Sequence, residues 1–171
     1  RSVDLNWETE EAEWASPTTL LRRDTVPELW TSYRRVAPSI VEIGNDTSHG
    51  SAYLSLRALE VVRDRAALLA TTDAPDIDDA RARLAETTQR LLEARPSMAA
   101  LANRLHRVLH ASAPDLRPAD VEERAHAAIG NAIDADTATA RRAADRIAGA
   151  RVLTLSRSGT VLDALRTADP A

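Results

Sequence analysis

Apolar residues in the middle of the chain recur every three or four positions, which is the spacing that lines one face of an α-helix. Between about residues 44 and 149, this pattern predicts a run of helices separated by turns, most of which contain proline. The expected helices cover about 52–69, 76–95, 98–111 and 121–147. Gly130 and Asn131 weaken the last of these helices, so a bend or break is expected there.

The residues before this helical region follow a different pattern. Apolar and polar positions alternate from Val3 to Trp7, which predicts a half-buried strand. Ser16-Pro17 and Pro27-Glu28 are each typical of the start of a helix.

A strand pattern returns near the end of the chain. Residues 151–155 read as a buried strand, residues 156–160 as a turn, and residues 161–166 as the start of a helix. A single strand does not make a stable sheet, so its neighbours are expected to come from other residues or from another chain.

Together these patterns predict a mainly α fold. It consists of a bundle of about five helices, with a short N-terminal strand/helix remnant and the first strand–turn–helix unit of an α/β domain at the C-terminus. The corresponding divisions are residues 1–43, 44–149 and 150–171. The core must be built mainly from Ala and Leu, because the chain has no Phe and only 3% aromatic residues. Helices lined with alanine pack closely but bury little area each, so modest stability per residue is expected.

The charge of the chain narrows the range of functions. The formal net charge is −4, from 26 acidic and 22 basic residues, and every basic residue is Arg. Direct binding of nucleic acid needs a basic excess or a clustered basic face and is not expected. The absence of Lys fits a GC-rich genome, and a salt-adapted cytoplasm is compatible with it.

Other features bear on the location and the chemistry of the protein. No apolar run is long enough to span a membrane and no signal peptide is visible, so a cytoplasmic protein is expected. The chain begins with Arg1 just before a strand pattern, so we expect it to be a fragment. The absence of Cys excludes disulfides, thiolate metal sites and a cysteine nucleophile. His106 and His110 have the i,i+4 spacing of metal ligands, but no third ligand is evident, so no metal or other cofactor is expected.

The strongest candidate site is the turn Ser156-Arg157-Ser158-Gly159-Thr160. A turn between the end of a strand and the start of a helix exposes backbone N–H groups to an anion, and the helix dipole adds positive potential. The glycine permits close approach, and the arginine can bind a phosphate through two hydrogen bonds. The alternative is that Ser158 or Ser156 simply caps the helix.

A second candidate is His49-Gly50-Ser51, because a glycine that opens a helix can seat a phosphate. The alternative is an ordinary helix start capped by Ser48. Arg95 could also reach a phosphate from the turn that follows its helix, or it could instead stabilise the C-terminus of that helix.

Three stretches resemble the translation initiation factor 2B alpha/beta/delta family, which includes sugar-phosphate isomerases and regulatory subunits. They are Glu93–Met98 with Leu101–Asn103, Arg151–Leu162, and His49–Ala52, and the resemblance runs from about Gly44 to Ala168. It implies that the candidate site residues bind a sugar phosphate or a nucleoside monophosphate. It also implies a following Rossmann-like α/β domain or a second chain as partner, and a homo- or hetero-oligomer.

The resemblance also bears on catalysis. The isomerases of the family carry a catalytic cysteine where Ser156 stands and a histidine where Leu155 stands. A serine hydroxyl is a much weaker acid than a cysteine thiol, so a regulatory or ligand-binding module is favoured over an enzyme. The alternative is a fragment of an enzyme similar to ribose-1,5-bisphosphate or methylthioribose-phosphate isomerase, or of a Nudix-fused nucleotide-processing enzyme.

A second resemblance lies upstream. The stretches Leu5–Glu8, Trp14–Pro17 and Thr25–Trp30 look like the tail of a Nudix hydrolase domain. The catalytic Nudix helix is absent from this sequence, and Glu10-Glu11 do not replace it. Residues 1–43 are therefore expected to be the remnant of such a domain.

Overall fold

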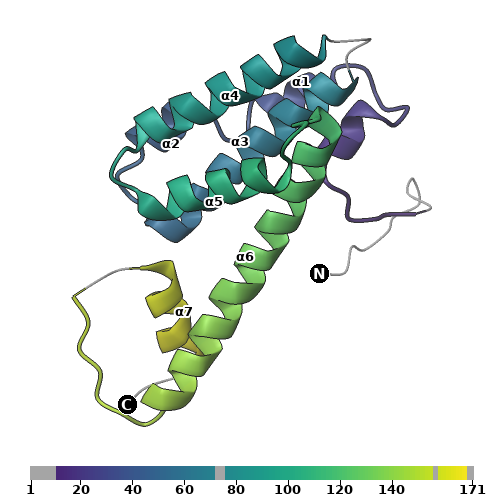
Figure 1. The fold of residues 1–171 in the computed structure, drawn as a ribbon. Helices are drawn as coiled ribbons and strands as arrows, with labels where there is room; N and C mark the ends of the chain where they lie inside the picture. The colour runs from purple at the N-terminus through teal and green to yellow at the C-terminus, as the bar shows by residue number, and fades with distance from the viewer. Residues whose placement is uncertain (1–10, 72–75, 156–157, 169–171) are drawn as a thin grey trace.

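The computed structural model describes residues 11–71, 76–155 and 158–168, and these residues form helices joined by turns (Figure 1). The elements are η1 (Pro17–Leu21, a 3-10 helix), α1 (Leu29–Arg34), α2 (Ile40–Asn45), α3 (Ser51–Thr71), α4 (Ile77–Ala94), α5 (Ala99–Ala111), α6 (Pro118–Ile147) and α7 (Gly159–Ala168). The main helices α3 to α6 match the sequence expectations closely. The described residues hold seven α-helices: α2 to α6 in the bundle, α1 at the helix start expected at Pro27-Glu28, and α7 at the helix expected near the end of the chain.

Helix α3 is the centre of the bundle. It contacts η1, α2, α4, α5, α6 and α7. Its Ala58, Leu59, Val62, Ala66 and Ala67 are almost completely shielded from solvent. Three of these five residues are alanines, and their small side chains let neighbouring helices approach the α3 backbone closely. The predicted core of Ala and Leu is confirmed.

Helix α6 begins inside the bundle and then leaves it. Val121 and Ala125, near its start, belong to the central core, whereas its second half extends away from the bundle and carries α7 alongside (Figure 1). The expected bend or break at Gly130-Asn131 is wrong, because α6 is continuous from Pro118 to Ile147. One glycine costs a helix only about 1 kcal/mol relative to alanine, and the many alanines of α6 outweigh that cost.

The predicted strand at residues 151–155 does not form. These residues have no regular secondary structure, Leu153 is 92% exposed and Leu155 is fully exposed. A strand is stabilised by hydrogen bonds to a neighbouring strand, and the described part of the chain contains none. The segment is apolar, as its pattern indicates, but the described residues do not bury it.

The segment before α3 packs onto the bundle. Ser16-Pro17 starts only the 3-10 helix η1, and the expected strand at Val3–Trp7 lies outside the described residues. Helix α2 was not predicted, although it begins with a capping box in which Ser39 and Glu42 bind each other's backbone N–H groups. Ile43 of α2 is only 2% exposed and joins the central core, so residue 43 lies within a helix of the bundle.

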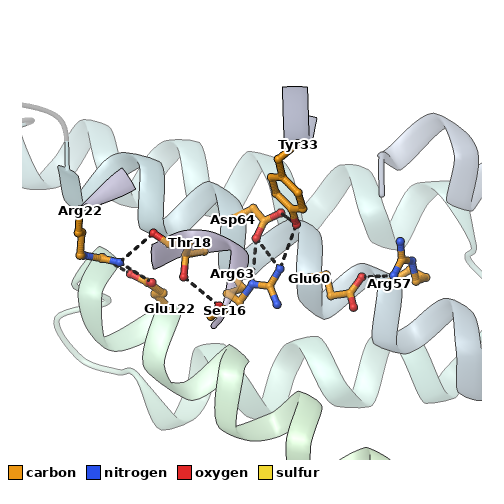
Figure 2. Close-up of polar contacts among 9 residues, drawn as sticks. All are labelled: Ser16, Thr18, Arg22, Tyr33, Arg57, Glu60, Arg63, Asp64 and Glu122. Atoms are coloured by element: carbon orange, nitrogen blue, oxygen red, sulfur yellow. Dashed lines mark hydrogen bonds and ion pairs between the residues drawn. The ribbon is translucent and has the colours of Figure 1, made fainter. Parts of the chain in front are cut away.

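Buried polar contacts fix this segment to α3 (Figure 2). The Tyr33 hydroxyl donates to Asp64 at 2.7 Å, and Arg63 donates to both Asp64 (Nη2–Oδ1, 2.7 Å) and the Tyr33 oxygen (3.2 Å). Burial, together with the hydrogen bond to Asp64, raises the pKa of Tyr33 well above its usual value. Further along, Arg22 after η1 forms an ion pair with Glu122 of α6. These contacts fix α1 to α3 and the end of η1 to α6.

The same face of α3 carries a half-buried acid. Glu60 lies close to Arg57, with 2.6 Å between Nη1 and Oε2 (Figure 2). Burial raises the pKa of Glu60, and the charge of Arg57 opposes that shift.

Among the helices described, none is long and apolar enough to cross a membrane.

Candidate functional site

The loop between α2 and α3 is organised around the carboxylate of Asp46. This carboxylate accepts hydrogen bonds from the backbone N–H groups of Ser48 and His49, both at 2.8 Å, and lies 2.7 Å from Nδ1 of His49. The bonds from the side chain and the backbone of His49 hold the pKa of Asp46 well below its usual range. The loop thus already contains an anion of its own, and Asp46 uses the N–H groups that precede Gly50.

The first turn of α3 offers further donors beyond this loop. The first helical bond runs from Leu54 N–H to the Gly50 carbonyl. The N–H groups of Ser51, Ala52 and Tyr53 donate to no residue that the structure describes. A Cβ placed on Gly50 would meet nothing within 4 Å. This end of α3 is therefore open to an approaching group.

The start of α7 has a similar form. The Ser158 side chain accepts a hydrogen bond from Val161 N–H at 3.2 Å, so Ser158 does cap the helix. The N–H groups of Gly159 and Thr160 donate to no described residue, and a Cβ on Gly159 would meet nothing within 4 Å. Ser156 and Arg157, the other members of the predicted turn, lie outside the described residues.

The two helix starts lie on the same side of the molecule. Helix α7 contacts α3 as well as α6, and Figure 1 shows the beginning of α7 below the end of the bundle where α3 begins. Each start carries the positive end of a helix dipole. Residues 49–51 and residues 158–160, about a hundred positions apart in sequence, thus lie at the starts of two helices that contact each other.

Arg95 occupies a different position from the one predicted. Its Nε donates to the carbonyl of Ile43 at 2.9 Å, and its Nη2 donates to the carbonyl of Asp46. Arg95 therefore stabilises the C-terminus of α2, not that of its own helix α4. It meets the His49 loop indirectly, because His49 binds the Asp46 carboxylate while Arg95 binds the Asp46 backbone.

Sequence reasoning missed three residues beside the start of α3. Arg104 of α5 donates to the Ser55 hydroxyl at 2.8 Å and to the Ala52 carbonyl at 3.2 Å. Tyr53 stacks on His49, with ring centroids 4.1 Å apart, and the Arg57 guanidinium lies 5.8 Å from the centre of the Tyr53 ring. His49, Tyr53 and Arg57 follow one another at a spacing of four residues, which was a signal for their contact. Nothing local points to Arg104.

The described residues contain no group of three or more His, Asp or Glu side chains that could hold a metal ion. His106 and His110 are both exposed on α5. Apart from the carboxylate of Asp46, which the loop itself binds, the starts of α3 and α7 present backbone donors and hydroxyls. Such an arrangement is suited to an anionic group.

Comparisons with known proteins give one match. A model of the Initiation factor 2 subunit family matches residues 47–171, from the loop before α3 to the end of the chain. A search of the curated proteins and a search of the solved structures each found no match. The family match includes all the main helices of the bundle, together with α7. This chain belongs to the Initiation factor 2 subunit family.

Proposed function

We propose that the chain is a ligand-binding module that holds the phosphate of a sugar phosphate or a nucleoside monophosphate at the starts of α3 and α7. The observation that carries the proposal is the set of free backbone N–H groups in the first turns of these two helices, which contact each other. The ligand would lie beyond Asp46, because that carboxylate would repel a phosphate placed directly over the loop.

In this proposal, the donors come from Gly50-Ser51 and from Ser158-Gly159-Thr160, and Ser156 and Arg157, which lie outside the described residues, are proposed as further ligands. His49 adds a positive charge when it is protonated. Arg95 acts by holding the loop, since its contacts are with the carbonyls of Ile43 and Asp46. No residue is assigned a catalytic role.

The module would work with a larger assembly. Leu153 and Leu155 are apolar and exposed, and residues 151–155 have the composition of a sheet strand. We propose that this segment pairs with a following α/β domain or with a second chain, and that the protein acts as an oligomer. We also propose that residues 1–43 derive from the tail of a Nudix hydrolase domain. Sequence upstream of Arg1 that lacks any Nudix pattern would argue against that origin.

Amide chemical shifts measured by NMR test the phosphate site. Addition of ribose 5-phosphate or adenosine 5′-monophosphate should shift the signals of Ser51, Gly159 and Thr160. Replacing Gly50 and Gly159 together by Asp should weaken binding by tenfold or more, because each carboxylate would stand in open space beside the donors.

The matched control is Gly130→Asp, in the middle of α6. A Cβ at that position also meets nothing within 4 Å, so Gly130→Asp adds one carboxylate, half the charge of the double variant, in the middle of α6 and away from both helix starts. It should leave the binding unchanged. A folded protein whose amides do not respond to either ligand, or an equal loss in the control, would refute the proposal.

A further inference from the structure

A pocket of about 370 Å³ lies where α1 and α2 meet α3 and α4. Trp30 and Arg34 of α1 and Ile40 of α2 form one side, and Arg65 of α3 and Arg90 of α4 form the other. The first three of these residues precede the region that matches the family model, which begins at residue 47. The pocket therefore exists because the preceding segment folds onto the family module.

Arg65 is the first indication that this pocket holds a ligand. Its Nε is buried, and the side chain makes no hydrogen bond or ion pair with any residue that the structure describes. Arg65 as a whole is half-buried, whereas its neighbour Arg63 is fully buried and is bound by Asp64 and Tyr33. A buried N–H donor without a partner is costly, because it loses its hydrogen bonds to water and gains none in return. An anion in the pocket would supply the missing partner.

The other charges around the pocket leave a positive excess. Arg34 makes no ion pair within the described part of the chain, and Arg90 lies 3.9 Å from Glu86, at an exposed position. Asp64 also lines the pocket, but its carboxylate is bound by Arg63 and the Tyr33 hydroxyl. Among the described residues that line the pocket, three are arginines, and Glu86 is the one acid without such a buried partner.

The remaining wall of the pocket is apolar. Trp30 is half-buried and packs against Tyr33, with ring centroids 5.2 Å apart, and Ile40, Val61 and Leu68 line the same cavity. A flat ring can rest on such a wall while an attached anion reaches the arginines. The volume is at the lower end of the range of about 300–1,000 Å³ that is usual for small-molecule sites.

We propose that this pocket binds an organic phosphate that carries a flat, apolar ring. The guanidinium of Arg65 binds the phosphate, Arg34 and Arg90 add charge, and Trp30 contacts the ring. The site is separate from the starts of α3 and α7. Arg65 lies fourteen residues after Ser51, which corresponds to about 21 Å along the helix axis.

Titration of the chain with phenyl phosphate tests the proposal, with inorganic phosphate and phenol as the two half-probes. Calorimetry should show that phenyl phosphate binds at least tenfold more tightly than either half-probe. The side-chain Nε–H signal of Arg65, identified as the one missing from Arg65→Gln, should shift on addition of phenyl phosphate. The variant carrying Asp at both Gly50 and Gly159 should keep this binding, which separates this site from the one proposed above.

Substitutions in the pocket separate the contribution of the arginines from that of the aromatic wall. Arg65→Gln should weaken binding of phenyl phosphate tenfold or more, and Trp30→Leu should remove its advantage over inorganic phosphate. Arg107→Gln is the matched control, because Arg107 of α5 also lacks an ion pair with any described residue but lines a different groove. If Arg65→Gln does not fold, the exposed pair Arg34→Gln and Arg90→Gln should together give the same loss. No binding by folded wild-type protein, or equal binding by the arginine variants, would overturn the proposal.

Discussion

The bundle and the C-terminal arm of this molecule are both helical, but they are held together differently. The bundle consists of α2 to α5 with the first part of α6, and leucines such as Leu59, Leu91 and Leu101 fill its core. The arm consists of the second part of α6, residues 148–155 and α7. The buried side chains in the arm are alanines: Ala132, Ala140, Ala144 and Ala164.

This difference follows from the area that each side chain removes from water. A buried leucine contributes about 1.5–3 kcal/mol, and a buried alanine contributes much less. The bundle therefore has a core sufficient for a stable fold. The arm leaves Leu153 and Leu155 in solvent, so its stability depends on contacts that the described residues do not supply. The helical pattern in the sequence is the same in both regions, and only the size of the buried side chains separates them.

The largest expected effect on stability comes from comparing a leucine in the core of the bundle with an exposed leucine of the arm. Leu59→Ala should destabilise the protein by about 2–5 kcal/mol, because Leu59 is 0% exposed and its removal leaves a cavity. Leu153→Ala should change stability by less than about 0.5 kcal/mol, because that side chain is 92% exposed. Urea unfolding followed by circular dichroism measures both. Similar losses for the two variants would show that Leu153 is buried in solution.

A smaller effect is expected from enlarging the alanine seam of the arm. Ala144→Leu should cost about 1–3 kcal/mol of local stability, because the larger side chain forces α6 and α7 apart. Hydrogen exchange should then speed up in α7 and leave the amides of α3 protected. Ala138→Leu, at an exposed position of α6, is the matched control and should change neither. Faster exchange throughout α3 would mean that the arm and the bundle unfold as one unit.

The smallest effect concerns the polar contact that ties α1 to the bundle. Tyr33→Phe should cost about 1–2 kcal/mol, because it removes a hydrogen bond to a buried carboxylate. The raised pKa of Tyr33 also makes the stability of the protein depend on pH, because the folded state favours the neutral phenol. The stabilisation by Tyr33 is complete below the ordinary tyrosine pKa of about 10 and is lost as the pH rises above it.

Unfolding midpoints between pH 7 and pH 11 measure this dependence. The wild-type protein should lose more stability above pH 10 than Tyr33→Phe does. Tyr53→Phe serves as the comparison, because the Tyr53 hydroxyl makes no hydrogen bond with a described residue and its ring is 43% exposed. It should follow the wild-type curve. Parallel curves for wild type and Tyr33→Phe would show that Tyr33 is not buried against Asp64.

Much of the bundle was predictable from local signals. The apolar spacing gave α3 to α6 within a few residues, and Pro96 and Pro118 marked their limits, because proline restricts the backbone around it. Helix α2 had a readable capping box at Ser39 and Glu42 that went unrecognised. The wrong expectations at residues 151–155 and at Gly130 had different causes. A strand needs a neighbouring strand, and a long helix tolerates one weak residue when its other residues favour it.

Some residues of the candidate site were likewise predictable from local signals, and others were not. Gly50 and Gly159 were recognisable because each opens a helix, and that property is local. The role of Arg95 was not recognisable, because its partners Ile43 and Asp46 lie about fifty residues earlier in the chain. Arg104, which reaches the first turn of α3 from α5, was hidden for the same reason.

The sequence by itself therefore determined the main helices, their apolar faces and the two glycine-led helix starts, because these depend on residues within a few positions of each other. The tertiary structure decided which helices contact each other, which arginines are bound by the protein and which have no partner among the described residues. Arg63 and Arg65 illustrate the difference. They are two positions apart on one helix, yet the folded chain supplies Asp64 and Tyr33 to the first and no described partner to the second. Their distinction rests on what packs against each face of α3, and only the folded chain contains that information.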